Sequence, residues 1–133
     1  MVFNFDSLYS SVPFILMGIP VTLKYTFISI FFGLILGVLL ALMSQSKTFS
    51  IPRYFSRAYI SLFRGTPLLV QLFLIYYGTP QLTGYTISAF EAGILALSLN
   101  SGAYICEIVR SGIQAIDPGQ FEAAASLGIP YSL

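Results

Sequence analysis

Apolar residues in this chain form three long stretches, which are separated by short segments rich in polar residues. The first stretch runs from about residue 21 to 43, the second from about 59 to 77 and the third from about 89 to 108. A helix of about 20 apolar residues crosses the roughly 30 Å hydrocarbon layer of a bilayer. The pattern therefore predicts an all-α, polytopic membrane protein, with three transmembrane helices in one domain over residues 1–133.

Composition agrees with this prediction and excludes several classes of function. Hydrophobic residues make up 56% of the chain and charged residues 8%, whereas soluble domains contain about 25% charged residues. The net charge of +1 gives no indication of a nucleic-acid partner. The chain has no histidine and one cysteine, Cys106. We therefore expect no catalytic residues, no metal ligands and no bound cofactor.

Basic residues predict the orientation of the spans. The stretch from residue 44 to 64, which follows the first span and reaches into the second, contains four of the six basic residues, namely Lys47, Arg53, Arg57 and Arg64. Cytoplasmic loops are enriched in Lys and Arg, so this loop is expected inside and the N-terminus outside. Residues 1–14 contain Asp6 and no basic residue, so we expect no signal peptide.

The first span carries a stripe of small residues at intervals of four. A stripe of this kind allows another helix to approach closely. Two interpretations are open: packing within the chain, or contact with a second subunit. The four residues are Ser29, Gly33, Gly37 and Ala41.

The second span is interrupted by Gly65 and Pro67. We expect Pro67 to kink a helix that continues to residue 77, with a short outer loop over 79–88. Arg64 and Gln71 are seven residues apart, so one helix face would hold both and would contact protein or water. Two interpretations are open: Thr66 or a neighbouring helix satisfies the carbonyl freed by the kink, or the break shapes a pathway.

The third span has one polar stripe on an apolar helix. Asn100, Tyr104, Glu107 and Ser111 follow at spacings of four, three and four. A carboxylate inside a membrane is a functional candidate. One interpretation is that Glu107 pairs locally with Arg110, three residues on. The other is that Asn100 or Glu107 lines a substrate route.

The last segment, residues 114–133, reads as a cytoplasmic loop with a short helix exposed to water. Asp117 is a good N-cap, Gln120 stands at the third helical position, as in a capping box, and Glu122 follows near the first turn. Gly128 is a stop signal. Three alanines, 123–125, give the helix a face with almost no side chain, which suits docking into a groove of another protein.

Three motifs resemble those of permease subunits of ATP-binding-cassette (ABC) importers, in the polar amino-acid uptake family. Glu122-Ala123-Ala124 with Gly128 is similar to the EAA loop of these permeases. Residues 63–72, FRGTPLLVQL, and residues 100–113, NSGAYICEIVRSGI, resemble two further signatures. The similarity extends from about Gly18 onward. It implies the N-terminal part of a five-span type I importer permease fold in a prokaryotic cytoplasmic membrane.

The resemblance also implies partners and residue roles. Such permeases pair with a second permease subunit, receive a polar amino acid from an extracytoplasmic binding protein, and couple to a separate ATP-binding subunit. The chain has no phosphate-binding loop, so ATP would be bound by that partner. Candidate coupling residues are Asp117, Gln120, Glu122, Ala123, Ala124 and Gly128. The polar residues within the apolar spans, and not the resemblance, supply the candidates for the translocation path. These candidates are Arg64, Thr66, Gln71, Asn100, Tyr104 and Glu107.

The chain ends at Leu133, whereas members of the family add two more spans after the EAA loop. We therefore expect a truncated permease. A small three-helix membrane interaction or assembly protein and a non-functional permease fragment are the alternatives, and a membrane-embedded enzyme has the least support.

Overall fold

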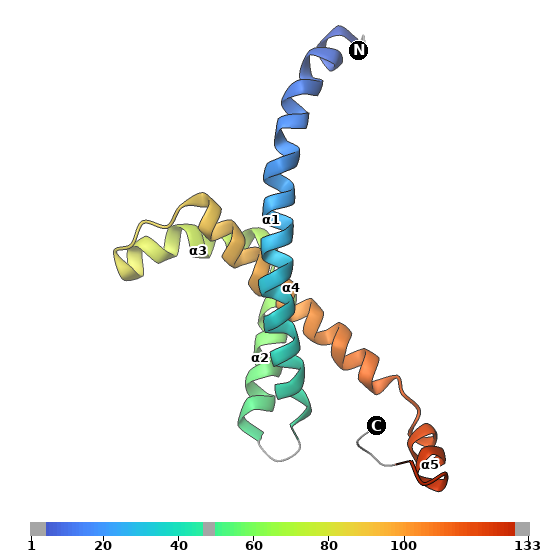
Figure 1. The fold of residues 1–133 in the computed structure, drawn as a ribbon. Coiled ribbons are helices and arrows are strands. Elements are labelled where there is room, and N and C mark those ends of the chain that lie inside the picture. Colours follow the sequence, from blue (N-terminus) through green and yellow to red (C-terminus); the bar gives the residue numbers. More distant parts are fainter. Residues whose placement is uncertain (1–4, 47–49, 130–133) are drawn as a thin grey trace.

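The computed structural model describes residues 5–46 and 50–129, with side chains from residue 9 onward. Lys47 and the end of the predicted loop, residues 130–133, lie outside the described residues. The described part consists of helices α1 (Phe5–Gln45), α2 (Ser50–Gly65), α3 (Leu68–Thr83), α4 (Ala89–Gln114) and α5 (Pro118–Ser126), which confirms the all-α prediction (Figure 1).

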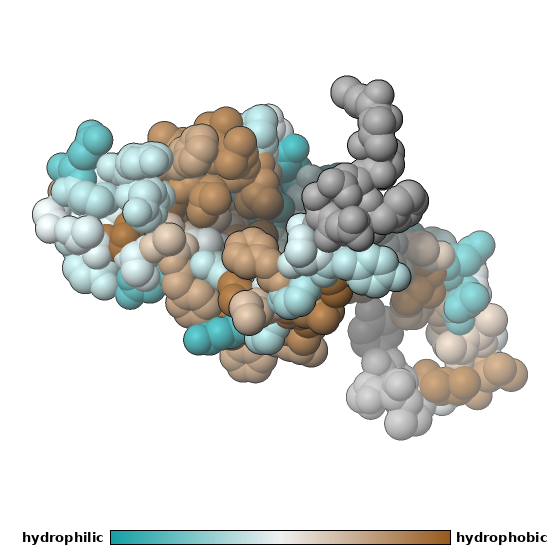
Figure 2. Space-filling model, turned by 90° about the horizontal axis from the view of Figure 1, so that it is seen from above, coloured by the Kyte–Doolittle hydropathy of each residue, from teal (hydrophilic) through white to brown (hydrophobic). Residues whose placement is uncertain are grey.

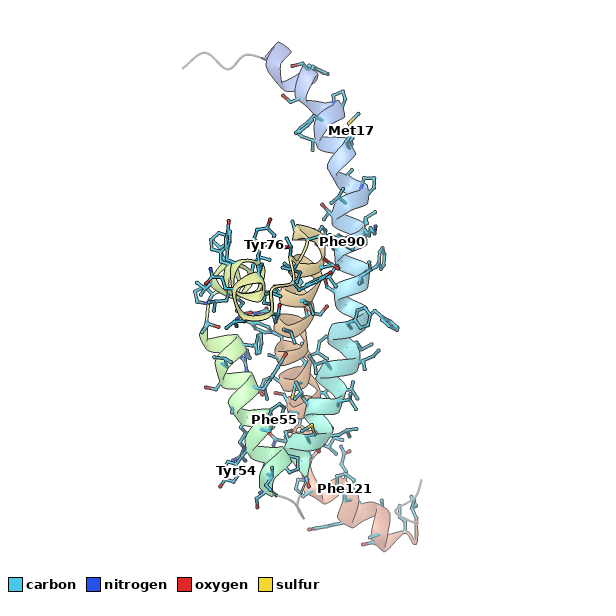
Figure 3. The ribbon with its side chains drawn as sticks, turned by 90° about the vertical axis from the view of Figure 1, so that its left-hand side faces the viewer. Met17, Tyr54, Phe55, Tyr76, Phe90 and Phe121 are labelled. Atoms are coloured by element: carbon cyan, nitrogen blue, oxygen red, sulfur yellow. The ribbon has the colours of Figure 1, made fainter. Side chains whose placement is uncertain are left out.

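Helix α1 is much longer than the predicted first span. It has 41 residues and includes Pro13 and Pro20, so it extends about 60 Å at 1.5 Å per residue. The prediction began after Pro20, but the helix continues through both prolines. Its N-terminal part projects beyond the other helices and exposes apolar side chains such as Phe14 and Met17 (Figures 1 and 3).

The second predicted span is not one helix. Instead, α2 begins at Ser50, well before residue 59, and α2 and α3 are bent by 103° relative to each other. Pro67 causes this break because it lacks an N–H and restricts the residue before it. The predicted loop 79–88 is also wrong in its first part, since α3 continues to Thr83 and ends at Gly84, whose φ is 73°.

Helix α4 agrees with the third predicted span and continues six residues further, to Gln114. Its start is fixed by a capping box between Ser88 and Glu91. Tyr85, in the preceding loop, donates a hydrogen bond to Glu91 Oε1 (3.1 Å), and this contact raises the pKa of Tyr85. In the described residues, α1 and α4 are each long and apolar enough to cross a membrane, and the bent pair α2–α3 would make a third span.

The core lies between α1 and α4, where the small-residue stripe packs within the chain. A Cβ atom on Gly33 would lie 2.8 Å from Ser101 Cβ, and one on Gly37 would lie 2.6 Å from Ile105 Cγ2. Ser29 and Ala41 are buried on the same side. Much of the outer surface is apolar, and Figure 2 shows a broad hydrophobic patch on one face, as expected for a protein surrounded by lipid.

Candidate functional site

A charged cluster joins the C-terminal half of α4 to α2. Glu107 accepts a hydrogen bond from Arg110 Nε (3.1 Å), and a second one from Arg110 Nη2, on the same helix. This confirms the predicted local pair. Arg64 Nη1 of α2 lies 3.7 Å from Glu107 Oε1, and its guanidinium lies 5.4 Å from the centre of the Tyr104 ring. One carboxylate is therefore shared by two guanidinium groups, one of which belongs to a different helix.

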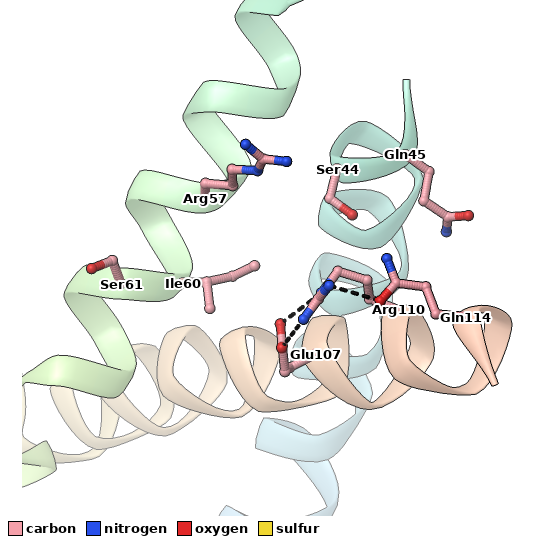
Figure 4. A pocket seen from close by; sticks show the side chains of 8 residues that line it. All are labelled: Ser44, Gln45, Arg57, Ile60, Ser61, Glu107, Arg110 and Gln114. Carbon is pink, nitrogen blue, oxygen red and sulfur yellow. Dashed lines mark hydrogen bonds and ion pairs between the residues drawn. The ribbon is translucent and has the colours of Figure 1, made fainter. Parts of the chain in front are cut away.

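The cluster borders a cavity of about 640 Å³ between the ends of three helices (Figure 4). Its walls are partly polar and partly apolar and carry both signs of charge, so it can hold water or a small zwitterionic solute. Figure 4 shows Arg57 on one side and the Glu107–Arg110 pair on another. The lining residues are Ser44, Gln45, Arg57, Ile60, Ser61, Glu107, Arg110 and Gln114.

Sequence reasoning missed most of this lining. Of the eight residues, only Glu107 was a candidate for the path, and Arg110 was named only as its partner. The available signal was the group of polar residues at the ends of the spans, such as Ser44, Gln45 and Gln114. Polar residues at the end of a span are ordinarily interpreted as contacts with solvent. Only the approach of three helices shows that these residues line one cavity.

A second polar group lies at the break between α2 and α3. Gln71 Nε2 donates to Phe63 O (2.9 Å) and to Thr66 Oγ1 (2.8 Å), and Asn100 Nδ2 donates to Gln71 Oε1 (3.2 Å). Thr66 Oγ1 donates to Leu62 O (2.8 Å), whereas the carbonyl that Pro67 leaves without a donor, Phe63 O, accepts from Gln71 and from Asn100 of α4 (3.3 Å). The freed carbonyl is therefore satisfied by neighbouring helices and not by Thr66. That the break also shapes a pathway stays a prediction.

The six candidates for the path therefore fall into two groups. Arg64, Tyr104 and Glu107 meet at the charged cluster, whereas Thr66, Gln71 and Asn100 meet at the break. The expectation that Arg64 and Gln71 share a face of one helix was wrong, because the break separates them. Both side chains nevertheless contact protein, as expected for polar groups in an apolar layer.

The short helix α5 has the predicted start and stop. Asp117 Oδ1 accepts from Gly119 N (2.7 Å), Pro118 is the first helical residue, and Gly128 has a φ of 72°. The expected capping-box contact of Gln120 is not among the hydrogen bonds of residues 117–129; the capping box of the described chain is at Ser88 and Glu91. Glu122 and Ala123 are exposed and Ala124 is half-buried.

Removing the N-cap should loosen α5 without affecting the spans. Because Asp117 Oδ1 satisfies an otherwise unpaired N–H, Asp117→Ala should cost about 1 kcal/mol of helix stability. Hydrogen exchange of the amides of residues 119–121 would then accelerate by about fivefold. Asp117→Asn keeps the acceptor and is the control. Equal exchange in the two variants would show that the cap does not stabilise α5.

The sequence matches a known family of membrane proteins. The family model described as "Binding-protein-dependent transport system inner membrane component" matches residues 33–132, which is most of the chain. The chain belongs to this family. Members of this family are inner membrane components of binding-protein-dependent transport systems, and the resemblance drawn from the three motifs is confirmed.

Curated relatives align with almost the whole length of this chain. The "Arginine transport system permease protein ArtQ" of Bacillus subtilis is 50% identical over 128 residues, which cover 96% of this chain and 58% of the relative. The "Putative glutamine transport system permease protein GlnP" of Rickettsia conorii is 51% identical over 125 residues, covering 94% and 57%. The chain therefore spans a little over half the length of these curated relatives.

A solved structure has the same fold as this chain. It is described as "Crystal structure of an amino acid ABC transporter with histidines". The two chains superpose with a TM-score of 0.87 at 46% sequence identity, over 99% of this chain and 61% of the other. The arrangement of α1 to α5 is therefore that of the matching part of an amino-acid transporter.

Proposed function

We propose that this chain forms part of the permease of an ABC importer for polar amino acids and docks through α5 onto a separate ATP-binding subunit. The observation that carries the proposal is the place of α5: a helix with Asp117 at its start and Gly128 after its end, presenting Glu122 and Ala123 to solvent. It lies at the end of the molecule that also holds Tyr54 and Phe55 (Figure 3). The N-terminal helix projects from the opposite end.

The positions of charged residues support this orientation. Arg53 and Arg57 on α2 and Arg110 on α4 lie toward the end of the spans near α5. The positive-inside rule supports a cytoplasmic position for that end and an N-terminus outside. An ATP-binding subunit would then reach α5 from the cytoplasm. A second permease subunit and an extracytoplasmic binding protein would complete the importer.

The charged cavity supports a polar amino acid as substrate. A free amino acid carries a carboxylate and an ammonium group, and the cavity offers Arg57 and Glu107. Its volume of about 640 Å³ leaves room for such a solute with some of its water. We assign it to the inner section of the route. The named relatives concern arginine and glutamine, both of which belong to this class.

The test is co-purification of an amino-acid ABC ATP-binding subunit of the source organism with the tagged chain from membranes. Glu122→Arg should lower the recovered ATP-binding subunit at least about tenfold, because a reversed charge at a docked rim costs on the order of 1.4 kcal/mol or more. Glu91→Gln, at the far end of α4, is the control and should leave recovery unchanged.

Two outcomes would contradict the proposal. One is recovery that is insensitive to Glu122→Arg, which would place the docking surface elsewhere. The other is a chain that inserts stably in the membrane and never retains an ATP-binding subunit. That result would favour the small membrane interaction protein or the non-functional fragment.

A further inference from the structure

The junction of α2 and α3 leaves backbone groups that a continuous helix would have paired. Pro67 has no N–H, so the Phe63 carbonyl loses the donor that residue i+4 supplies in a helix. Between two helices bent by 103°, further carbonyls of the last turn of α2 are also left over. In an apolar layer each unpaired carbonyl is costly. The junction therefore requires donors from side chains.

Gln71, in the first turn of α3, supplies most of these donors. Its Nε2 lies 2.9 Å from Phe63 O, 3.1 Å from Thr66 O and 2.8 Å from Thr66 Oγ1. The side chain is 7% exposed, and no other residue of α3 is buried as deeply. Its amide thus bonds back across the break to the end of α2, so it connects the two arms of the bent pair directly.

Asn100 of α4 makes contacts of a different kind with the same junction. Its Nδ2 lies 3.2 Å from Gln71 Oε1 and 3.3 Å from Phe63 O. These two contacts are longer than all three made by Gln71 Nε2. They also run between the bent pair and another helix, whereas those of Gln71 Nε2 stay within the bent pair.

We infer that α2 and α3 form a rigid elbow, locked internally by the Gln71 amide and docked on α4 by Asn100. A movement of the second span against the third would then open the two Asn100 contacts, together with the contacts of Arg64 with Glu107 and of Tyr59 with Leu99, and keep the bend. Straightening the elbow would also break the Gln71 contacts, which hold the backbone carbonyls that Pro67 leaves unpaired. Gln71 is thus a positioning residue, which fixes the direction of α3 relative to the end of α2.

Spin labels near the far ends of the two arms report the bend. Ile51 and Leu82 are 83% and 88% exposed, and each lies about 21 Å from the break at 1.5 Å per residue. Their separation is about 26 Å at the observed bend of 103° and about 45 Å in a straight helix. Cys106 is fully buried, and a sample without the two introduced cysteines sets the background labelling.

Distance distributions from pulsed electron resonance on the chain in lipid nanodiscs test the inference. Gln71→Met keeps the side-chain length and removes the amide, so the distribution should broaden and its mean should increase by about 5 Å or more. Gln81→Met, on the exposed outer part of the same helix, is the matched control and should change nothing. Asn100→Ala should leave the distribution as narrow as in the unmodified chain.

Thr66→Val provides a second, milder test, because it removes one acceptor of the Gln71 amide and keeps the volume. It should broaden the distribution less than Gln71→Met does, and it keeps the inference testable if Gln71→Met does not accumulate.

A narrow distribution in the Gln71 or Thr66 variant would overturn the inference, since Pro67 alone would then set the bend. Equal broadening by Asn100→Ala would also overturn it, since docking on α4 would then hold the bend. All residues of the elbow lie within this chain, so the test does not depend on the proposed partner subunits.

Discussion

Gly37→Ala should destabilise the protein by about 1–3 kcal/mol, although alanine favours a helix more than glycine does by about 1 kcal/mol. A Cβ at this position would lie 2.6 Å from Ile105 Cγ2, 2.7 Å from Ile105 Cβ and 3.0 Å from Gly102 O. The last contact is with backbone, so repacking of one side chain cannot relieve it. Helices α1 and α4 would have to separate, which weakens the main core contact of the fold.

Gly78→Ala is the matched control for this effect. Gly78 lies inside α3, and a Cβ there would meet no heavy atom within 4 Å. The control should therefore be neutral or slightly stabilising. The measurement is the free energy of unfolding in mixed lipid–detergent micelles, followed by circular dichroism. If both substitutions shifted the unfolding free energy equally, the close packing of α1 on α4 would not be a source of stability.

Glu107→Lys should lower amino-acid uptake by about tenfold in the assembled transporter. The substitution places a third cation beside Arg64 and Arg110, so two attractions become repulsions. The side chains of Arg64 and Glu107 are 40% and 25% exposed, so each contact is worth about 1 kcal/mol or less. Reversing two of them changes the free energy by on the order of 1.4 kcal/mol, which corresponds to a factor of ten.

A second substitution separates the two contacts of Glu107. Arg64→Glu combined with Glu107→Lys restores an attraction between α2 and α4 and leaves the repulsion with Arg110 on α4. Uptake should recover in part if the contact between helices matters for transport. Recovery of the ATP-binding subunit with the chain should stay constant throughout, because α5 is separate from the cluster. A parallel loss of subunit recovery and uptake would identify Glu107 as a structural residue.

The sequence by itself determined the features that depend on local physical chemistry. Apolar stretches of sufficient length predicted helices where α1, the α2–α3 pair and α4 occur. Asp117, Pro118 and Gly128 determined α5, because caps act within one turn of the chain. The Glu107–Arg110 pair was equally accessible, since residues three apart on a helix are neighbours. The motifs added the family, which the comparisons confirmed.

Only the tertiary structure decided how the polar residues are grouped. Spacing placed Arg64 and Gln71 on one face, but the 103° break separates them into two clusters. A proline predicts that a helix is interrupted, but the angle of the interruption is not encoded by the spacing of residues along the chain. The cavity lining is likewise spread over three helices. Such contacts join residues 29 to 40 positions apart, such as Asn100 with Gln71 and Tyr59 with Leu99, and no local periodicity encodes them.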